Sequence, residues 1–352
     1  MGDRGQKTEK RTKKIMSGEE KKDGQKILPF KTQTGLELAN AAPEVYHGLV
    51  DDLLLDVGVS MLCGKPKTGK STMARQLAVA VAEGNPFLGK PTLCGDVLYL
   101  ILEGPKGVVQ QHLKKLGVTE KRGTIHVVHE QMPHRGELGL QRLEETIRHF
   151  PKLKLVIVDP VSKLLRMADS DSYDEVTVGI EMLEQIAKRY SLHLQFLTHG
   201  KKRGSDDVGD SPIGSTGFRA GTDTNIFLGK QGAQRIISTE QRWGISMEPT
   251  LLFFDGEIEA MSLGSTVEDE EAARNEARER KTVERIEQEI MEALTVEVNP
   301  TQGDLLALVT GKTALKLKVL QQLESSGKLK SEIDGKARRY SIAVPVEKGG
   351  AA

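Results

Sequence analysis

Residues 64–71 read Gly64-Lys65-Pro66-Lys67-Thr68-Gly69-Lys70-Ser71, and Thr72 follows directly. They fit the pattern G-x-x-x-x-G-K-[ST] without a mismatch. The apolar run 57–63 before them predicts a strand, and the apolar periodicity of 71–83 predicts a helix. The backbone N–H groups of such a loop turn toward a phosphate, and the helix N-terminus adds partial positive charge. The stretch from Gly64 to Thr72 therefore predicts a nucleoside triphosphate site rather than a chance glycine-rich turn.

Lys70, Ser71 and Asp159 are the residues expected to hold the phosphates and a metal ion. Lys70 would meet the β- and γ-phosphates of ATP, while the Ser71 hydroxyl would ligate Mg²⁺. Asp159 closes the apolar run 155–158, and a carboxylate there can hold Mg²⁺ through its water shell. Acidic residues also end strands as plain turn residues, but the phosphate-binding loop favours the metal role. ATP and Mg²⁺ are therefore the expected cofactors.

Hydrolysis of ATP also needs a group that orients or deprotonates the attacking water. Glu103 follows the apolar run 97–102, and we expect this strand beside the strand of the phosphate-binding loop. A carboxylate at the carboxyl end of a central strand faces the ligand crevice; the alternative is that Glu103 caps the next helix. His199 follows the run 194–197 in the same crevice as Asp159, and a structural histidine is its alternative role.

Short apolar runs alternate with helical stretches from about residue 28 to residue 263. Apolar strands separated by helices indicate a mostly parallel sheet covered on both faces, and hence an α/β fold. Three later segments, 224–228, 234–238 and 251–254, are expected to extend the sheet antiparallel at one edge. The other predicted elements are the strands 96–102, 153–158 and 192–198 and the helices 107–116, 138–150 and 173–190.

Composition narrows the class of protein without naming a partner. The 352 residues allow one large and one small domain, and 38% are hydrophobic, enough to fill a core. The 50 basic and 50 acidic side chains balance, so overall charge does not point to nucleic acid. Cys63 and Cys94 lie beside apolar runs and are expected as reduced thiols, with one disulfide as the alternative. No run resembles a signal peptide or is long enough to span a membrane, which predicts a cytoplasmic protein.

The C-terminal part of the chain predicts a second unit that binds DNA. Residues 264–282 are almost wholly charged or small and predict a linker or a solvated helix. Three helices and a hairpin are expected between 283 and 345, which is the order of a winged helix; such units also serve as protein–protein modules. Residues 305–345 carry eight basic and three acidic side chains, a net charge of +5. The residues expected to touch DNA are Lys316 and Lys318 in the helix 313–326 and Arg338 and Arg339 in the hairpin.

Both ends of the chain are expected to be tails. Residues 1–27 hold nine basic and five acidic side chains. They predict a disordered basic tail, with a nucleic-acid-binding arm as the alternative. Residues 346–352 predict a short C-terminal tail, so order is expected between them, with the main domain at 28–263.

The motifs together resemble those of the RecA/DnaB-type ATPases, and more narrowly the group that contains the plasmid RepA hexameric helicases. The resemblance covers about residues 28–263. It implies a RecA-like P-loop core in which the acid at Glu103 activates water and the residue at His199 senses the γ-phosphate. Besides the phosphate-binding loop, its marks are 48–50 (GLV), 81–89 (VAEGNPFLG), 98–104 (LYLILEG), 155–160 (LVIVDP), 197–201 (LTHGK) and 214–216 (GST).

Members of that group form hexameric rings in which a neighbouring subunit supplies an arginine to the γ-phosphate. Arg242, in 240–244 (EQRWG), resembles their basic-x-Arg-x-Gly stretch, although Glu240 stands where lysine is usual. Arg219, in 217–221 (GFRAG), is the second candidate, and a surface salt bridge is the alternative role for either. The polar loop after the histidine corresponds to one that holds single-stranded DNA in the ring channel, unless it is an ordinary solvated loop. Its candidate phosphate contacts are Lys201, Lys202 and Arg203.

The sequence thus predicts an oligomeric, ATP- and Mg²⁺-dependent DNA motor. It would be most like a RepA-type replicative helicase of a plasmid, phage or mobile element. The alternative is a RecA-like ATPase switch that acts as a DNA-bound regulator, loader or recombination mediator without unwinding. A small-molecule kinase would share the phosphate-binding loop, but the sequence offers no clear acceptor-binding lid with arginines.

Overall fold

The computed structural model describes residues 30–42, 47–130, 136–165, 173–199 and 216–343. The chain divides into two units, residues 1–45 and 46–352. The described part of the first unit holds the helix α2 (Gly35–Asn40). Thr34 and Glu37 form a capping box at its start, in which each side chain accepts the other's backbone N–H.

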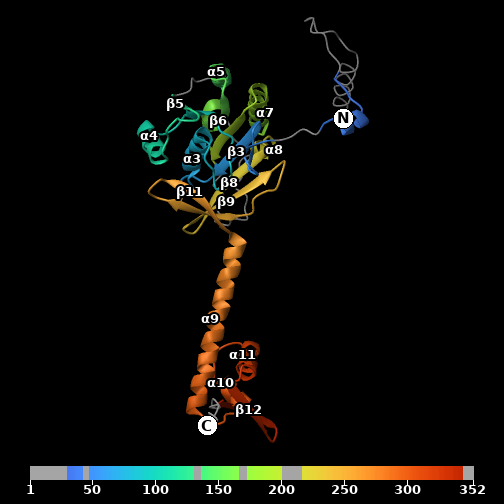
Figure 1. Cartoon of the computed structure of the whole chain (residues 1–352), viewed down its shortest axis with the longest axis vertical. Coiled ribbons are helices and arrows are strands. Elements are labelled where there is room, and N and C mark those ends of the chain that lie inside the picture. The colour runs from blue at the N-terminus through green and yellow to red at the C-terminus, as the bar shows by residue number, and fades with distance from the viewer. Residues whose placement is uncertain (1–29, 43–46, 131–135, 166–172, 200–215, 344–352) are drawn as a thin grey trace, which may run out of the picture. The chain divides into compact units, whose positions relative to one another are not determined.

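A nine-stranded sheet dominates the second unit, in the order β11-β10-β9-β8-β3-β7-β6-β4-β5 (Figure 1). The strands from β8 to β5 in this order run parallel, and β9, β10 and β11 continue the sheet antiparallel. This mostly parallel sheet confirms the α/β fold class and fits a RecA-like P-loop core. The strands are β3 (Gly58–Gly64), β4 (Asp96–Ile101), β5 (Ile125–Val128), β6 (Leu153–Asp159), β7 (His193–His199), β8 (Thr224–Gln231), β9 (Gln234–Gln241), β10 (Thr250–Asp255) and β11 (Ala260–Thr266).

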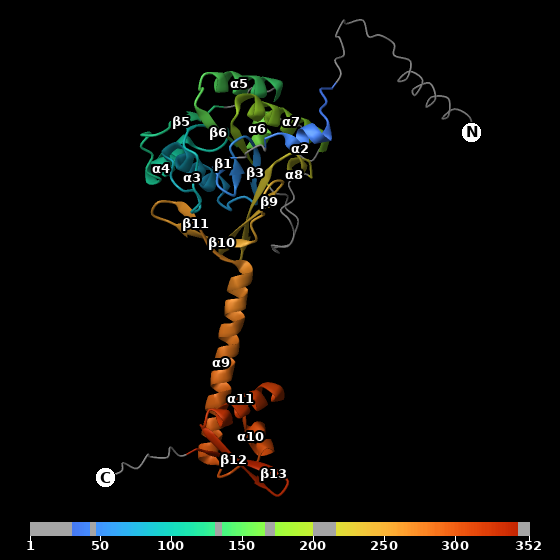
Figure 2. The same ribbon diagram turned by 45° about the vertical axis from the view of Figure 1, so that its right-hand side comes forward.

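Helices cover both faces of this sheet, so the core has two halves (Figures 1 and 2). Successive side chains of a strand face opposite sides. In β3, Leu62 therefore packs with the half under α3 and α4, while Met61 packs with the half under α5, α6, α7 and α8. A short antiparallel pair, β1 (Gly48–Val50) and β2 (Leu54–Leu55), adds to the first half. The helices are α3 (Lys70–Glu83), α4 (Lys106–Lys115), α5 (Gly136–Arg148), α6 (Val161–Leu165), α7 (Tyr173–Tyr190) and α8 (Thr216–Ala220).

The prediction that the strand before Glu103 lies beside the strand of the phosphate-binding loop is wrong. β7 and β8 flank β3, and β6 and β7 separate β3 from β4. Parallel crossovers can pass over strand positions, so order along the chain does not give order in the sheet. The two edge strands, β5 and β11, were also not predicted, because one has four residues and the other contains Gly264.

A separate hydrophobic cluster joins the C-terminal elements. Ile286 and Ile290 of α9 (Val267–Val296) pack with Leu320 of the helix α11 and with Tyr340 of the hairpin. The charged segment 264–282 is helical from Val267 onward, as the solvated-helix alternative predicted. Figure 2 shows α10 and α11 beside the end of α9, followed by the hairpin. The remaining elements are α10 (Gln302–Leu308), α11 (Thr313–Ser325), β12 (Leu329–Asp334) and β13 (Ala337–Ile342).

Three other sequence-based expectations concern thiols, tails and membranes. Neither Cys63 nor Cys94 forms a disulfide within the described residues. The predicted tails, 1–27 and 346–352, lie outside the described residues. Within the described ranges, no helix combines the length and the apolar character needed to cross a bilayer.

Candidate nucleotide site

The phosphate-binding loop connects the end of β3 to the start of α3, and close contacts fix its backbone. A Cβ atom on Gly64 would lie 2.4 Å from the carbonyl oxygen of Leu228, and one on Gly69 would lie 2.3 Å from Cε of Met261. Gly69 also has φ +106°, a left-handed conformation that favours glycine. The Thr68 hydroxyl donates to the carbonyl of Lys65 across the loop (2.9 Å). Contact with a backbone carbonyl therefore requires glycine at position 64, and the left-handed backbone conformation favours it at position 69.

Lys70 is the first residue of α3, and its side chain folds back over the loop. Its ammonium donates to the carbonyl oxygens of Gly64 (2.8 Å) and Lys65 (3.1 Å). The residue is only 8% exposed, and burial lowers the pKa of its ammonium, while the nearby charges of Cys63 and Asp159 raise it. A buried ammonium held at the mouth of the loop is placed to bind phosphate oxygens.

Asp159 ends β6 opposite the start of α3. Burial raises the pKa of this carboxyl, and hydrogen bonds from Ser71 and Tyr99 and the charges of Arg75 and Lys70 lower it. The Tyr99 hydroxyl donates to Oδ2 of Asp159 (3.2 Å). A carboxylate bonded to the Ser71 hydroxyl offers the oxygen ligands that Mg²⁺ prefers. These two side chains therefore fit the predicted metal role.

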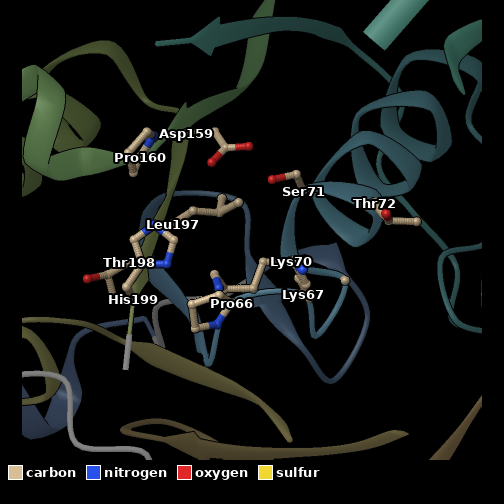
Figure 3. A pocket seen from close by; sticks show the side chains of 11 residues that line it. Pro66, Lys67, Lys70, Ser71, Thr72, Asp159, Pro160, Leu197, Thr198 and His199 are labelled. Carbon is tan, nitrogen blue, oxygen red and sulfur yellow. The ribbon is translucent and has the colours of Figure 1, made fainter. Parts of the chain in front are cut away.

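The loop, Asp159 and His199 border one cavity of about 280 Å³ (Figure 3). Figure 3 shows the Asp159 carboxylate turned toward the Ser71 hydroxyl. His199 ends β7, where the register pairs it with Gly64 of β3, so the neighbouring strand brings it to the loop. The residues that line the cavity are Pro66, Lys67, Gly69, Lys70, Ser71, Thr72, Asp159, Pro160, Leu197, Thr198 and His199.

Glu103 does not line this cavity. It is exposed two residues after β4 and borders a neighbouring cavity of about 370 Å³ together with His129, Glu130 and Lys163. Ile101 pairs with Asp159 in the register of β4 and β6, so the Glu103 segment continues the sheet edge beside the nucleotide cavity. His129 is hydrogen-bonded through Nε2 to the carbonyl of Gly104 (3.0 Å), which fastens the turn that carries Glu103.

The two candidate arginines lie away from the cavity of their own chain. Arg219 forms a two-pronged ion pair with Glu240, with Nε at 3.1 Å from Oε2, and also lies over the ring of Phe227. Arg242 is exposed and donates through Nη2 to the carbonyl of Ala220. The surface salt bridge that was the alternative for either residue is thus present at Arg219.

The candidate DNA-contacting residues differ in how exposed they are and in which groups their charged atoms already contact. Lys316 is 9% exposed, and its ammonium donates to the carbonyls of Leu306 (2.6 Å) and Val309 (2.9 Å). It caps the end of α10, so its predicted place on a DNA-facing surface is wrong. Lys318 is exposed. Arg338 is paired with Glu324 and Arg339 with Asp334, each at 2.9 Å, while Lys201, Lys202 and Arg203 lie outside the described residues.

A family model for the AAA domain matches residues 25–205, just over half of the chain. The chain belongs to the AAA domain family. Its members carry a P-loop ATPase domain, so membership supports ATP hydrolysis and implies nucleotide binding, typically with Mg²⁺. The matched range contains the phosphate-binding loop, Asp159 and His199, which are the residues that the cavity brings together.

The chain also resembles a curated protein. The DNA repair protein RAD57 of Saccharomyces cerevisiae is 27% identical to it over 181 residues, which cover 45% of this chain and 36% of RAD57. The chain therefore matches just over a third of that relative's length. The likeness supports a RecA-like ATPase core.

Sequence reasoning missed two residues of this AAA domain that contact the nucleotide site without lining its cavity. Tyr99 lies inside an apolar strand and reads as core, yet its hydroxyl reaches Asp159. Gln76 of α3 makes two hydrogen bonds of 2.8 Å to the backbone of Met261, which packs against the loop. A polar group inside an apolar run was the available signal for Tyr99. Nothing in the sequence pairs residues 76 and 261, which meet only through the sheet order.

Proposed function

We propose that the chain is an oligomeric, ATP- and Mg²⁺-dependent DNA motor, most like a RepA-type replicative helicase of a plasmid, phage or mobile element. The observation that carries the proposal is the cavity shared by the phosphate-binding loop, Asp159 and His199. It combines the phosphate-binding loop, a carboxylate for a metal ion and a polar side chain for the γ-phosphate, all at the carboxyl edge of a parallel sheet.

The reaction is transfer of the γ-phosphoryl group from ATP to water, which yields ADP and inorganic phosphate. Lys70 binds the β- and γ-phosphate oxygens. Ser71 and Asp159 would hold Mg²⁺, which would supply further positive charge for the phosphates. Glu103 accepts the proton of the attacking water as the new P–O bond forms. His199 contacts the γ-phosphate and responds to its loss.

An arginine from a neighbouring subunit completes this mechanism in an oligomer, with a hexameric ring as the proposed form. Arg242 is the better candidate of the two, because within the described residues its exposed guanidinium donates to a neutral acceptor, the carbonyl of Ala220. Arg219 would first have to leave the carboxylate of Glu240. Such an arginine can raise the rate by about 10³-fold or more.

DNA is the proposed partner of two parts of the chain. The polar loop with Lys201, Lys202 and Arg203 would hold single-stranded DNA through its phosphates. The elements from α9 to β13 would act as a winged helix on duplex DNA, since three helices precede an antiparallel hairpin. Lys318 is the exposed cation of α11 available for a phosphate contact.

The second candidate is a RecA-like ATPase switch that regulates, loads or mediates recombination on DNA without unwinding it. The likeness to RAD57, named as a DNA repair protein, favours this role. Both candidates use the same nucleotide site, and they differ in whether hydrolysis drives strand displacement.

The test is the steady-state ATPase rate with and without single-stranded DNA. A motor requires strong stimulation by DNA that Glu103→Gln abolishes and a matched Glu130→Gln change, in the same neighbouring cavity, leaves in place. Stimulation would then be followed by a strand-displacement assay, in which no displacement leaves the switch. An ATPase rate indifferent to DNA would rule out the motor.

A further inference from the structure

The nucleotide cavity accounts for the phosphates and leaves the nucleoside part of the ligand to be placed. Ser71 and Asp159 would hold Mg²⁺ beside the terminal phosphates, so the side of the cavity with Asp159 and His199 would be the γ-phosphate end. The ribose and base would then extend away from β6 and β7, past Gly69. On that side, Met261 of β11 packs directly against Gly69, so the strands β9, β10 and β11 form the wall that a nucleoside would meet.

Two planar side chains stand on this wall. The guanidinium carbon of Arg235 lies 4.9 Å from the ring centroid of Phe254. The register pairs Leu252 with Arg235 and Phe254 with Met261. Since Leu252 and Met261 belong to the core half under α3, Arg235 and Phe254 lie on the same face of the sheet as the phosphate-binding loop.

Arg235 lies close to the loop, and within the described residues its Nε has no hydrogen-bond partner. Its Nε is 4.0 Å from the position that a Cβ of Gly69 would take. This Nε is buried and has no hydrogen-bond partner in the described part of the chain. An unsatisfied buried donor is costly. Arg219, which also lies over a phenylalanine, has its Nε satisfied by Glu240, so the two arginines are in different situations.

Phe254 is partly open to solvent although it faces the loop. It is 39% exposed, whereas its register partner Met261 is 3% exposed. An exposed aromatic ring under a guanidinium is a surface on which a flat base can stack, since aromatic faces and arginine planes both bind bases in this way.

We propose that Arg235 and Phe254 form the stacking platform for the base of the bound nucleotide. The ligand class is a nucleoside di- or triphosphate, with its phosphates on the loop and its base on this pair. Purines stack over a larger area than pyrimidines, so the platform favours ATP and GTP over CTP and UTP. This inference rests on the proposed nucleotide site and adds the part that recognises the nucleoside.

The experiment compares two ligands that share phosphates but differ in having a nucleoside. The affinities of ADP and of inorganic pyrophosphate, each with Mg²⁺, are measured by titration calorimetry on the full chain. Arg235→Gln and Phe254→Leu should each weaken ADP binding about tenfold and leave pyrophosphate binding within twofold of wild type. Arg235→Lys keeps the charge but loses the plane, and should weaken ADP binding in the same way.

Matched controls come from the same strand and the same charge type. Phe253→Leu removes the neighbouring ring of β10, which is 58% exposed on the opposite face and packs on Gly264, and should not change ADP affinity. Arg280→Gln removes an exposed arginine of α9 and should also have no effect. Circular dichroism melts check that each variant is folded, and Arg235→Lys carries the test where Phe254→Leu does not fold.

The outcomes separate this inference from the proposed function. Loss of ADP affinity with unchanged pyrophosphate affinity supports the platform. Equal weakening of both ligands, or no weakening of either, overturns it while the nucleotide site stands. A wild-type chain that binds neither ligand overturns the proposed function itself.

Discussion

Two regions of the chain each bury a lysine and use it in opposite ways. Lys70 in the phosphate-binding loop and Lys316 in α11 are 8% and 9% exposed. Each ammonium donates to two backbone carbonyls, at 2.8 and 3.1 Å for Lys70 and at 2.6 and 2.9 Å for Lys316. Lys70 borders an open cavity that contains Asp159, whereas Lys316 closes the end of α10. Similar local chemistry therefore places one ammonium at an open cavity and uses the other to close a helix terminus.

The largest effect is expected from Lys70→Ala. Removing the cation at the β- and γ-phosphates should lower the ATPase rate by about 10²–10³-fold, because the charge that develops during transfer loses a fixed partner. The assay is steady-state phosphate release with Lys316→Met as the matched control, which should keep the wild-type rate. Equal losses in both variants would break the contrast between the two lysines.

Acid should destabilise the ATPase core through one buried histidine. His193 is fully buried against the Ser60 hydroxyl (2.7 Å), and burial lowers its pKa from 6.5 to about 4. The unfolded chain takes up the proton first, so stability is full above pH 6.5 and falls by about 3 kcal/mol as pH drops toward 4. Residues 267–343 contain no histidine.

The check is urea unfolding at pH 7.5 and 4.5, with hydrogen exchange to follow the two regions separately. His193→Gln should remove this part of the pH dependence. A pH dependence unchanged in His193→Gln would contradict the assignment.

Lys316→Met should act on stability rather than on DNA. The carbonyls of Leu306 and Val309 lose their donor, which should destabilise the helices α10 and α11 by about 1–3 kcal/mol. Amide hydrogen exchange in these helices measures the loss. Lys318→Gln should leave exchange unchanged and, if the elements bind duplex DNA, reduce the slope of log affinity against log salt by about 1. The reverse pattern would return Lys316 to a DNA-facing role.

Tyr99→Phe should give the smallest effect and sharpen the description of the nucleotide region. The change removes only the hydroxyl that donates to Asp159, so the carboxylate loses part of its orientation. The Mg²⁺ concentration that half-saturates nucleotide binding should rise about tenfold, with little change in affinity for metal-free ADP. Calorimetry across a Mg²⁺ series measures both, and an unchanged Mg²⁺ requirement would contradict the positioning role.

The sequence predicted the elements that local pattern controls. The glycine and lysine spacing from Gly64 to Ser71 placed the phosphate-binding loop between a strand and a helix, and both are present. The run ending at Asp159 placed a carboxylate at the carboxyl edge of the sheet. Hydrophobic periodicity and flanking turns are short-range properties, so the main helices and the strands β3, β4, β6 and β7 were read within a few residues. The segment 224–228 was also read as a strand, but its expected antiparallel direction is wrong, because β8 runs parallel to β3.

Long-range order escaped the same reasoning. The sheet places β6 and β7 between β3 and β4, so the expected neighbourhood of Glu103 was wrong. The strand β11 supplies Met261 against Gly69, although about 190 residues separate them along the chain. Pairing of distant segments depends on the packing of the whole sheet, and no window of sequence contains it.

By itself, the sequence determined that this chain has a phosphate-binding loop, because such a loop binds phosphate through its own backbone and the helix that follows it. It also determined the α/β class, since alternating apolar runs and helices leave few other arrangements. Only the tertiary structure decided which charged side chains already have a partner within the chain. Lys316 and Arg219 look like surface cations in the sequence, but folding gives one the carbonyls of α10 and the other the carboxylate of Glu240. A side chain's function depends on its partners in space, and those partners come from elsewhere in the chain.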